Sequence, residues 1–169
     1  VTMYGQYLLA GVSNTNGASS YTLNRQASVT ETNIVTGNGI VHVIDNVLQP
    51  AKLTVAKLIE QNAELSIFTE ALKQTGLFDS LNVINLKDPS RRWLTVMAET
   101  NKALAKAGFN SFADLKKRYS NTGNPLKKED SLNLYVRYHI LSGAKYLADV
   151  ITATSHTTLA PLEVIRSEE

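Results

Sequence analysis

Hydrophobic and polar positions in the first fifty residues favour β structure. Residues 7–12 form an apolar run that ends in the turn-rich stretch SNTNGASS. Residues 28–35 are β-branched and largely alternating, and residues 40–44 are apolar throughout. The connection between them contains two glycines, which can take positive φ, so this segment is predicted to be a β-hairpin. Its second strand is apolar on both faces, which predicts a central strand rather than an exposed edge.

After Pro50 the period of the apolar positions changes to about 3.6, which predicts a series of helices. Their expected N-caps are Thr54, Asn62, Thr100 and Ser111. Gly76 and Gly108 are expected to end two of them. In the helix after Thr100, the apolar positions Ala103, Leu104 and Ala107 are expected to face inward.

The C-terminal half mixes helix and strand signals. Residues 131–141 are apolar nearly all round, which predicts a buried helix ending at Ser142-Gly143. Strands are predicted at 81–86, 94–98 and 146–151, and another is predicted to begin at 162–165.

Composition narrows the class of protein. Hydrophobic residues make up 43% of the 169 residues, so the chain can bury a core. The 17 basic and 15 acidic residues nearly balance, which disfavours a dedicated nucleic-acid-binding protein. No apolar run approaches the roughly 18 residues of a membrane helix. Cysteine is absent, which excludes disulfides and thiolate metal sites, and no Asn-X-Ser/Thr sequon occurs.

The three histidines are the first candidates for chemistry. His42 lies in the apolar strand and His139 in the apolar helix, and neither has a carboxylate at ligand spacing. Both are therefore predicted to be buried side chains that hydrogen-bond within the core. His156, in a polar stretch, is expected to be exposed. No Ser-His-Asp grouping or phosphate-binding glycine loop is present, so no cofactor, metal or catalytic residue is predicted.

Basic and aromatic residues suggest a binding surface. Arg92 precedes Trp93, whose ring could stack on a sugar, although core packing of Trp93 is the competing interpretation. The basic runs 116–118 and 127–128 could contact an acidic partner, and a solvated surface is the alternative.

Three blocks resemble the fasciclin domain family. Residues 39–48, GIVHVIDNVL, resemble the block that closes such a domain, and they include His42 and Asp45. Residues 94–104, LTVMAETNKAL, resemble an earlier block of the family. Its matching positions are Thr95, Thr100 and Asn101, whereas Met97 and Glu99 replace the usual Phe and Pro. The pair Tyr138-His139 is similar to the Tyr-His pair of the family.

The closing block precedes the other two, and this order implies two domains in tandem. Residues 1–50 resemble the C-terminal portion of one fasciclin domain, and residues 51–169 resemble the N-terminal two-thirds of the next. A single circularly permuted domain is the alternative. The resemblance implies an α+β fold, a fasciclin-like twisted β-sandwich wedge with a helical cluster on one side.

The same resemblance implies a non-catalytic adhesion or binding module of a tandem fasciclin protein at the cell surface or outside the cell, with a protein or glycan partner. In animal members, integrin adhesion is attributed to the Tyr-His region and to an Asp-Ile dipeptide before the closing block. Here Asn33-Ile34 occupies the dipeptide position. A neutral amide completes the coordination of a metal poorly, so direct integrin recognition is not expected.

Two other functions remain open at this stage. One is a glycan-capture surface lipoprotein in bacterial nutrient uptake, with Trp93 as a contact. The other is an enzyme that uses His139 and a carboxylate brought close by folding. The absence of cysteines and sequons favours a bacterial envelope, with any membrane anchor outside this chain.

Overall fold

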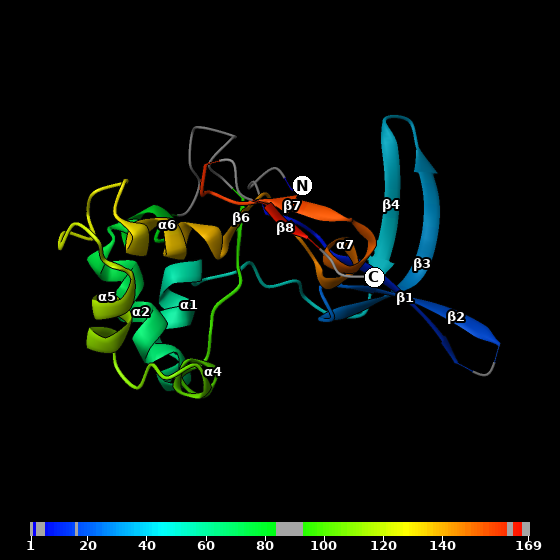
Figure 1. Cartoon of the computed structure of the whole chain (residues 1–169). Coiled ribbons are helices and arrows are strands. Elements are labelled where there is room, and N and C mark those ends of the chain that lie inside the picture. Colours follow the sequence, from blue (N-terminus) through cyan, green and yellow to red (C-terminus); the bar gives the residue numbers. More distant parts are fainter. Residues whose placement is uncertain (1, 3–5, 16, 84–92, 162–163, 167–169) are drawn as a thin grey trace. The chain divides into compact units, whose positions relative to one another are not determined.

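The computed structural model describes residues 2, 6–15, 17–83, 93–161 and 164–166 (Figure 1). The chain divides into two compact units, Val1–Lys52 and Leu53–Glu169. The described part of the first unit contains strands, and that of the second contains helices and short strands. The α+β class predicted from the sequence is confirmed.

The first unit is a four-stranded antiparallel sheet in the order β1-β2-β3-β4. Its strands are β1 Ala10–Thr15, β2 Ala18–Leu23, β3 Ala27–Thr36 and β4 Gly39–Ile44. The predicted hairpin is confirmed, because β3 and β4 pair from Val29↔Ile44 to Thr36↔Gly39. The glycines of its turn do not take positive φ. Asn33 does so instead, with φ 59 at an irregularity in β3.

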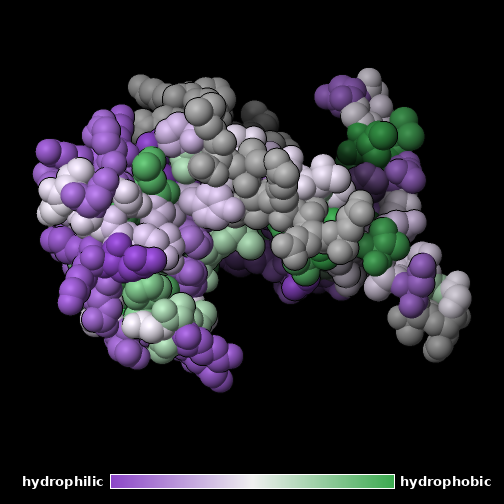
Figure 2. Space-filling view, in the orientation of Figure 1, coloured by the Kyte–Doolittle hydropathy of each residue, from purple (hydrophilic) through white to green (hydrophobic). Residues whose placement is uncertain are grey.

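The prediction of a covered central strand is wrong. β4 is the last strand of the sheet, and Ile40 and Val41 are 61% and 48% exposed. Figure 2 shows hydrophobic residues gathered on this hairpin. An apolar run indicates that a strand favours burial, but the covering layer must come from other segments, and no described element of this unit supplies it.

The stretch SNTNGASS is not a loop. It contains the second half of β1 and the first half of β2, which pair with each other in an antiparallel arrangement. Most residues of both strands are exposed, so apolar and polar residues do not alternate along them. The hydrophobic pattern therefore could not predict a strand there.

The second unit is built around a helical core. Its helices are α1 Val55–Glu60, the 3-10 turn η1 Ala63–Leu65, α2 Ser66–Gln74, α3 Leu77–Leu81, α4 Asn101–Lys106, α5 Phe112–Tyr119, α6 Ser131–Tyr138 and α7 Leu147–Thr152. The predicted caps are confirmed at Thr54, Asn62, Thr100 and Ser111, whose side chains each accept a backbone N–H. Fully buried Phe68, Leu72 and Leu115 lie at the centre of the core.

Two short antiparallel pairs complete the second unit. β5 Leu94–Val96 pairs with β6 Ile140–Ser142, and β7 Ser155–Thr157 pairs with β8 Val164–Arg166. A bridge between Leu141 and Thr158 links the two pairs. The predicted strand at 94–98 is thus confirmed for its first three residues.

Several local predictions need correction. Residues 146–151 are not a strand, because the Asp149 carboxylate accepts the Tyr146 N–H and starts α7. The helix predicted over 131–141 ends at Tyr138, since Ile140 and Leu141 pair with β5 instead.

Three further predictions are wrong in detail. Leu81 ends a helix, and Asn82 and Val83 are not in a strand; residues 84–86 of that prediction lie outside the described residues. Ala103 and Ala107 are exposed, whereas Leu104 is buried as expected. The start of the strand predicted at 162–165 falls partly outside the described residues, and β8 occupies its end.

Candidate functional site

The junction of α6 and β6 brings three polar side chains together. Leu132 and Val136 on α6 are fully buried and hold the helix on the core. Tyr135 and His139 lie one helical turn apart on a neighbouring face, and both approach Glu99 in the segment between β5 and α4. The Tyr135 hydroxyl donates a hydrogen bond to one Glu99 carboxylate oxygen. His139 Nε2 lies 3.6 Å from the other, which is an ion-pair distance.

The rest of the His139 ring is also engaged within the protein. Its Nδ1 lies 2.9 Å from the Tyr135 carbonyl oxygen, so that Nδ1–H donates to the backbone. The ring packs edge-on against Phe68 at 5.9 Å between centroids and against Tyr138 at 5.8 Å. With 16% of its side chain exposed, His139 joins the helix to the core.

The charges of this cluster support one another. Burial disfavours the imidazolium, but the Glu99 carboxylate and the Tyr135 carbonyl outweigh it and raise the pKa of His139. Burial likewise opposes the Glu99 charge, but His139 and the Tyr135 hydroxyl outweigh it and lower the pKa of Glu99. Burial and the bond to Glu99 raise the pKa of the Tyr135 hydroxyl. Glu99 and His139 therefore form an ion pair in mildly acidic solution.

The sequence did not predict this carboxylate next to His139. A partner for His139 was expected in the backbone, and the Tyr135 carbonyl fills that role, but Glu99 comes from a distant segment. The signal that could have found it was the replacement of the family's usual proline by Glu99.

Both ring nitrogens of His139 are engaged within the cluster. A Glu-His pair can activate a nucleophile, but both ring nitrogens of His139 already face protein acceptors. In the described part of the chain, no three His, Cys, Asp or Glu side chains meet as a metal site. Tyr138 is half-buried, and its ring lies edge-on to that of His139 at the edge of the cluster.

The residues of the earlier block have structural roles. The Thr95 hydroxyl donates to the Gly143 carbonyl at 3.0 Å and accepts the Lys145 N–H at 2.8 Å. Thr100 caps α4. The Asn101 side chain donates to the Ala63 carbonyl and accepts the N–H of Ile67, which ties the start of α4 to η1 and α2.

Trp93 and Arg92 contribute little that can be described as a site. Trp93 is half-buried, and its carbonyl accepts the Gly143 N–H at 2.8 Å, next to the β5–β6 pair. Arg92 lies outside the described residues.

The remaining predicted residues lie in the first unit. The Asn33 N–H donates to His42 Nδ1 at 3.3 Å, and Asn33, Ile34 and His42 are exposed. The expectation that His42 is buried is therefore wrong, because β4 is an uncovered edge strand. His156 shows the opposite error. It is 4% exposed, with Nε2 3.2 Å from the Val150 carbonyl, because the short β7 turns it inward.

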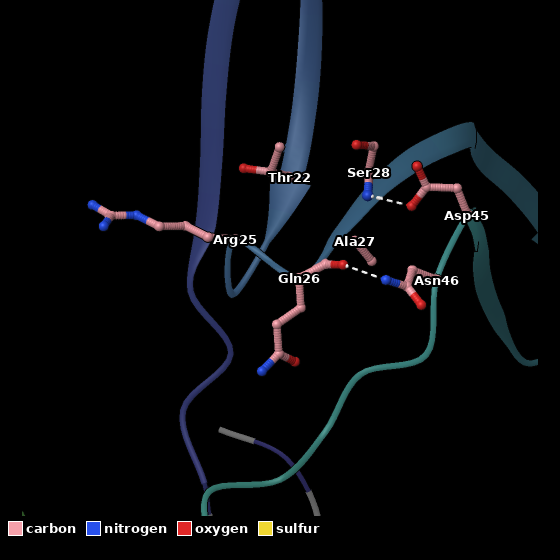
Figure 3. Close-up of a pocket in the computed structure, with 7 residues that line it drawn as sticks. All are labelled: Thr22, Arg25, Gln26, Ala27, Ser28, Asp45 and Asn46. Atoms are coloured by element: carbon pink, nitrogen blue, oxygen red, sulfur yellow. Dashed lines mark hydrogen bonds between the residues drawn. The ribbon is translucent and has the colours of Figure 1, made fainter.

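A polar hollow of about 400 Å³ also lies in the first unit (Figure 3). The Asp45 carboxylate in it accepts the Ser28 N–H at 2.6 Å, and the Asn46 amide donates to the Gln26 carbonyl at 3.0 Å. Arg25 points away from Asp45. These polar groups bind one another and hold the end of β4 to the start of β3. The hollow is therefore explained by this local structure, and we do not assign it as a binding site.

Comparisons with known proteins agree with the sequence blocks. The family model for the fasciclin domain matches residues 4–50 and 63–167. Among solved structures, the chain is similar to a FAS1 domain pair from the insect cell adhesion molecule Fasciclin I, at 19% identity and a TM-score of 0.45. That similarity covers 96% of this chain and 55% of the other, so the chain spans about half of that structure. No curated protein matches. None of the described helices is long and apolar enough to cross a membrane.

Proposed function

Because this chain belongs to the fasciclin family, we propose that it is a non-catalytic adhesion or binding module that acts at the cell surface or outside the cell. The main observation behind this proposal is the Glu99–Tyr135–His139 cluster, whose polar groups bind one another and fix the end of α6. The cluster thus serves as a rigid support for the half-buried Tyr138 beside it.

The proposed module consists of parts of two successive domains. Residues 1–50 are proposed to be the C-terminal portion of one fasciclin domain, and residues 51–169 the N-terminal portion of the next. The separate family matches and the compact units on either side of Lys52 support this division. The exposed apolar side chains of β4 support it too, because a strand of this composition favours a covered position.

The proposed location is a bacterial envelope. The support is compositional, since the chain has neither cysteines nor glycosylation sequons. A protein or a glycan of the cell surface is the proposed class of partner.

Attachment of cells to surfaces coated with the protein tests the adhesive function. We expect Tyr138→Ala to lower attachment several-fold, because an aromatic side chain at the centre of a contact contributes more than its neighbours. Tyr21→Ala is the matched control, since Tyr21 is an exposed tyrosine of the other unit. Equal attachment by both variants and the wild type would remove Tyr138 from the proposed surface. No attachment by the wild type would contradict adhesion itself.

A further inference from the structure

Five basic residues lie on α5 and on the loop that follows it. We call them the basic ridge: Lys116, Lys117, Arg118, Lys127 and Lys128. No Asp or Glu occurs between 115 and 128. Lys116 is half-buried, and the other four are exposed. Figure 2 shows strongly hydrophilic residues over α5 and this loop.

The loop is held in one conformation by buried polar groups. The fully buried Asp130 carboxylate accepts the Ser120 hydroxyl at 2.8 Å and the Thr122 N–H at 3.0 Å, so the two ends of the loop meet. The buried Asn133 amide donates to the Pro125 carbonyl at 2.8 Å. Because these bonds fix the loop before any ligand binds, its two lysines add little cost of ordering to binding.

No acidic residue in the described part of the chain neutralises the ridge. None of its five cations forms an ion pair with a described acidic residue; the described ion pairs are at Glu60 and Glu99. Asp130 is buried and hydrogen-bonded, and Asp114 accepts N–H and hydroxyl groups at the start of α5. Among the three described acidic residues that flank the ridge in sequence, Asp114, Glu129 and Asp130, Glu129 is the one that is exposed without such a role.

A helix dipole explains part of this pattern but not all of it. The three cations in the last turn of α5 face the negative end of the helix, where positive charge is stabilising. Lys127 and Lys128 lie outside any helix. Their accumulation beside like charges is unfavourable within the protein, and a bound polyanion would relieve it.

The residues around the basic ridge indicate which class of polyanion it binds: a nucleic acid, a membrane or a polysaccharide. Tyr119, the aromatic residue between the basic runs, stacks on Tyr135 at 4.5 Å between ring centroids and is unavailable for nucleic-acid bases. Leu126, 65% exposed, is the large apolar side chain of the loop, which is little for insertion into a membrane. We propose that the basic ridge binds an acidic polysaccharide that carries sulfate or carboxylate groups along its chain. This inference rests on the proposed function as a surface binding module.

Calorimetry with the whole chain tests the ridge, using heparin as the sulfated probe and polygalacturonate as the carboxylated one. We expect Lys127→Ser/Lys128→Ser to weaken binding of at least one probe by about tenfold at about 50 mM salt and to reduce its salt dependence, because two charge contacts are lost. The matched control is Lys102→Ser/Lys106→Ser, which removes two exposed lysines of α4. We expect it to bind within about twofold of the wild type.

The alternatives give different results. Equal weakening by both double variants, or binding of neither probe by the wild type, overturns the ridge proposal. Tighter binding to duplex DNA or to vesicles with phosphatidylserine than to either polysaccharide also overturns it. Failure of polysaccharide binding alone leaves the adhesion proposal in place. If only cell attachment fails, the adhesion proposal is overturned, and the proposal that the basic ridge binds an acidic polysaccharide still stands.

Discussion

At the scale of single residues, Glu99 changes the chemistry around the family's Tyr-His pair. A proline at this position could offer no carboxylate, whereas Glu99 accepts the Tyr135 hydroxyl and faces His139 at 3.6 Å. Because the pKa of His139 is raised, the protonated ring stabilises the fold at pH values below the ordinary histidine pKa of 6.5. This stabilisation is lost as the pH rises through the raised pKa. Because the pKa of Glu99 is lowered, its carboxylate stabilises the fold above its ordinary pKa of 4.5. This stabilisation is lost as the pH falls through the lowered value. The pair is therefore most stabilising between these two values.

Glu99→Gln tests this ion pair. We expect the melting temperature of the second unit to fall by about 4 °C at pH 6, because a partly buried pair contributes on the order of 1 kcal/mol. The difference from the wild type should be smaller at pH 8 than at pH 6, because the ion pair is lost as the pH rises through the raised pKa of His139. Thermal melts at both pH values measure it.

Glu60→Gln is the control for the pH dependence. Hydrogen bonds from Lys57 and Lys73 lower the pKa of Glu60 to about 2, and the pKa of Lys73 is raised above 10.5. Neither group titrates between pH 6 and 8, so the effect of Glu60→Gln should be the same at both. A difference for Glu99→Gln that stays constant as well would contradict the role of His139.

Asp130→Asn tests the anchor of the basic loop. The Asp130 carboxylate is fully buried and accepts from Ser120, Thr122 and the Leu132 N–H. An amide presents an N–H to some of these donors, so we expect a loss of about 2–4 kcal/mol in the free energy of unfolding, measured by urea titration. Asp149→Asn, at the exposed start of α7, should cost about 1 kcal/mol or less. Equal costs would contradict the special role of Asp130.

At the scale of elements, local signals were accurate at the helix caps. Thr54, Thr100 and Ser111 each begin a helix as predicted, and Gly76 separates α2 from α3 with φ 71. The errors came where an apolar run fits both a helix and a strand. Residues 140–142 leave the helical pattern because β5 offers them a strand partner.

Gly76→Ala tests the junction between α2 and α3. A left-handed residue with a Cβ costs about 1–2 kcal/mol, and the added methyl would lie 3.4 Å from Leu126 Cδ2. We expect that loss in the free energy of unfolding. Gly37→Ala is the control, because Gly37 has no positive φ and nothing within 4 Å of a new Cβ. A neutral Gly76→Ala would contradict the conformational argument.

At the scale of the whole molecule, the chain forms two compact units that divide after Lys52. Residues 47–52 belong to no helix or strand, and most are exposed. Gln6 forms two hydrogen bonds with Ala51, the described links that hold the end of this segment to the first unit.

Limited proteolysis tests the division. We expect trypsin under native conditions to cut first after Lys52 or near it, because exposed backbone without regular structure fits a protease site most easily. Mass spectrometry should then find that the fragment of the second unit persists longer than the fragment of the first unit. Gln6→Ala should speed this cleavage. First cleavage within α2 or α6 would contradict the division.

The fold class and the family blocks could be read from the sequence, because caps, turn residues and the period of apolar positions depend on neighbours along the chain. The β3–β4 hairpin and the starts of the capped helices are examples. The Tyr-His pair was found in the same way, as a local motif.

The site itself depended on tertiary structure. Whether Glu99 meets His139, whether His156 is buried and whether β4 is covered are all decided by segments distant in sequence, and periodicity carries no information about which segments meet. The sequence determined which residues favour helix, strand or turn. Only the packing of those elements decided which polar groups lack water and must therefore bind one another.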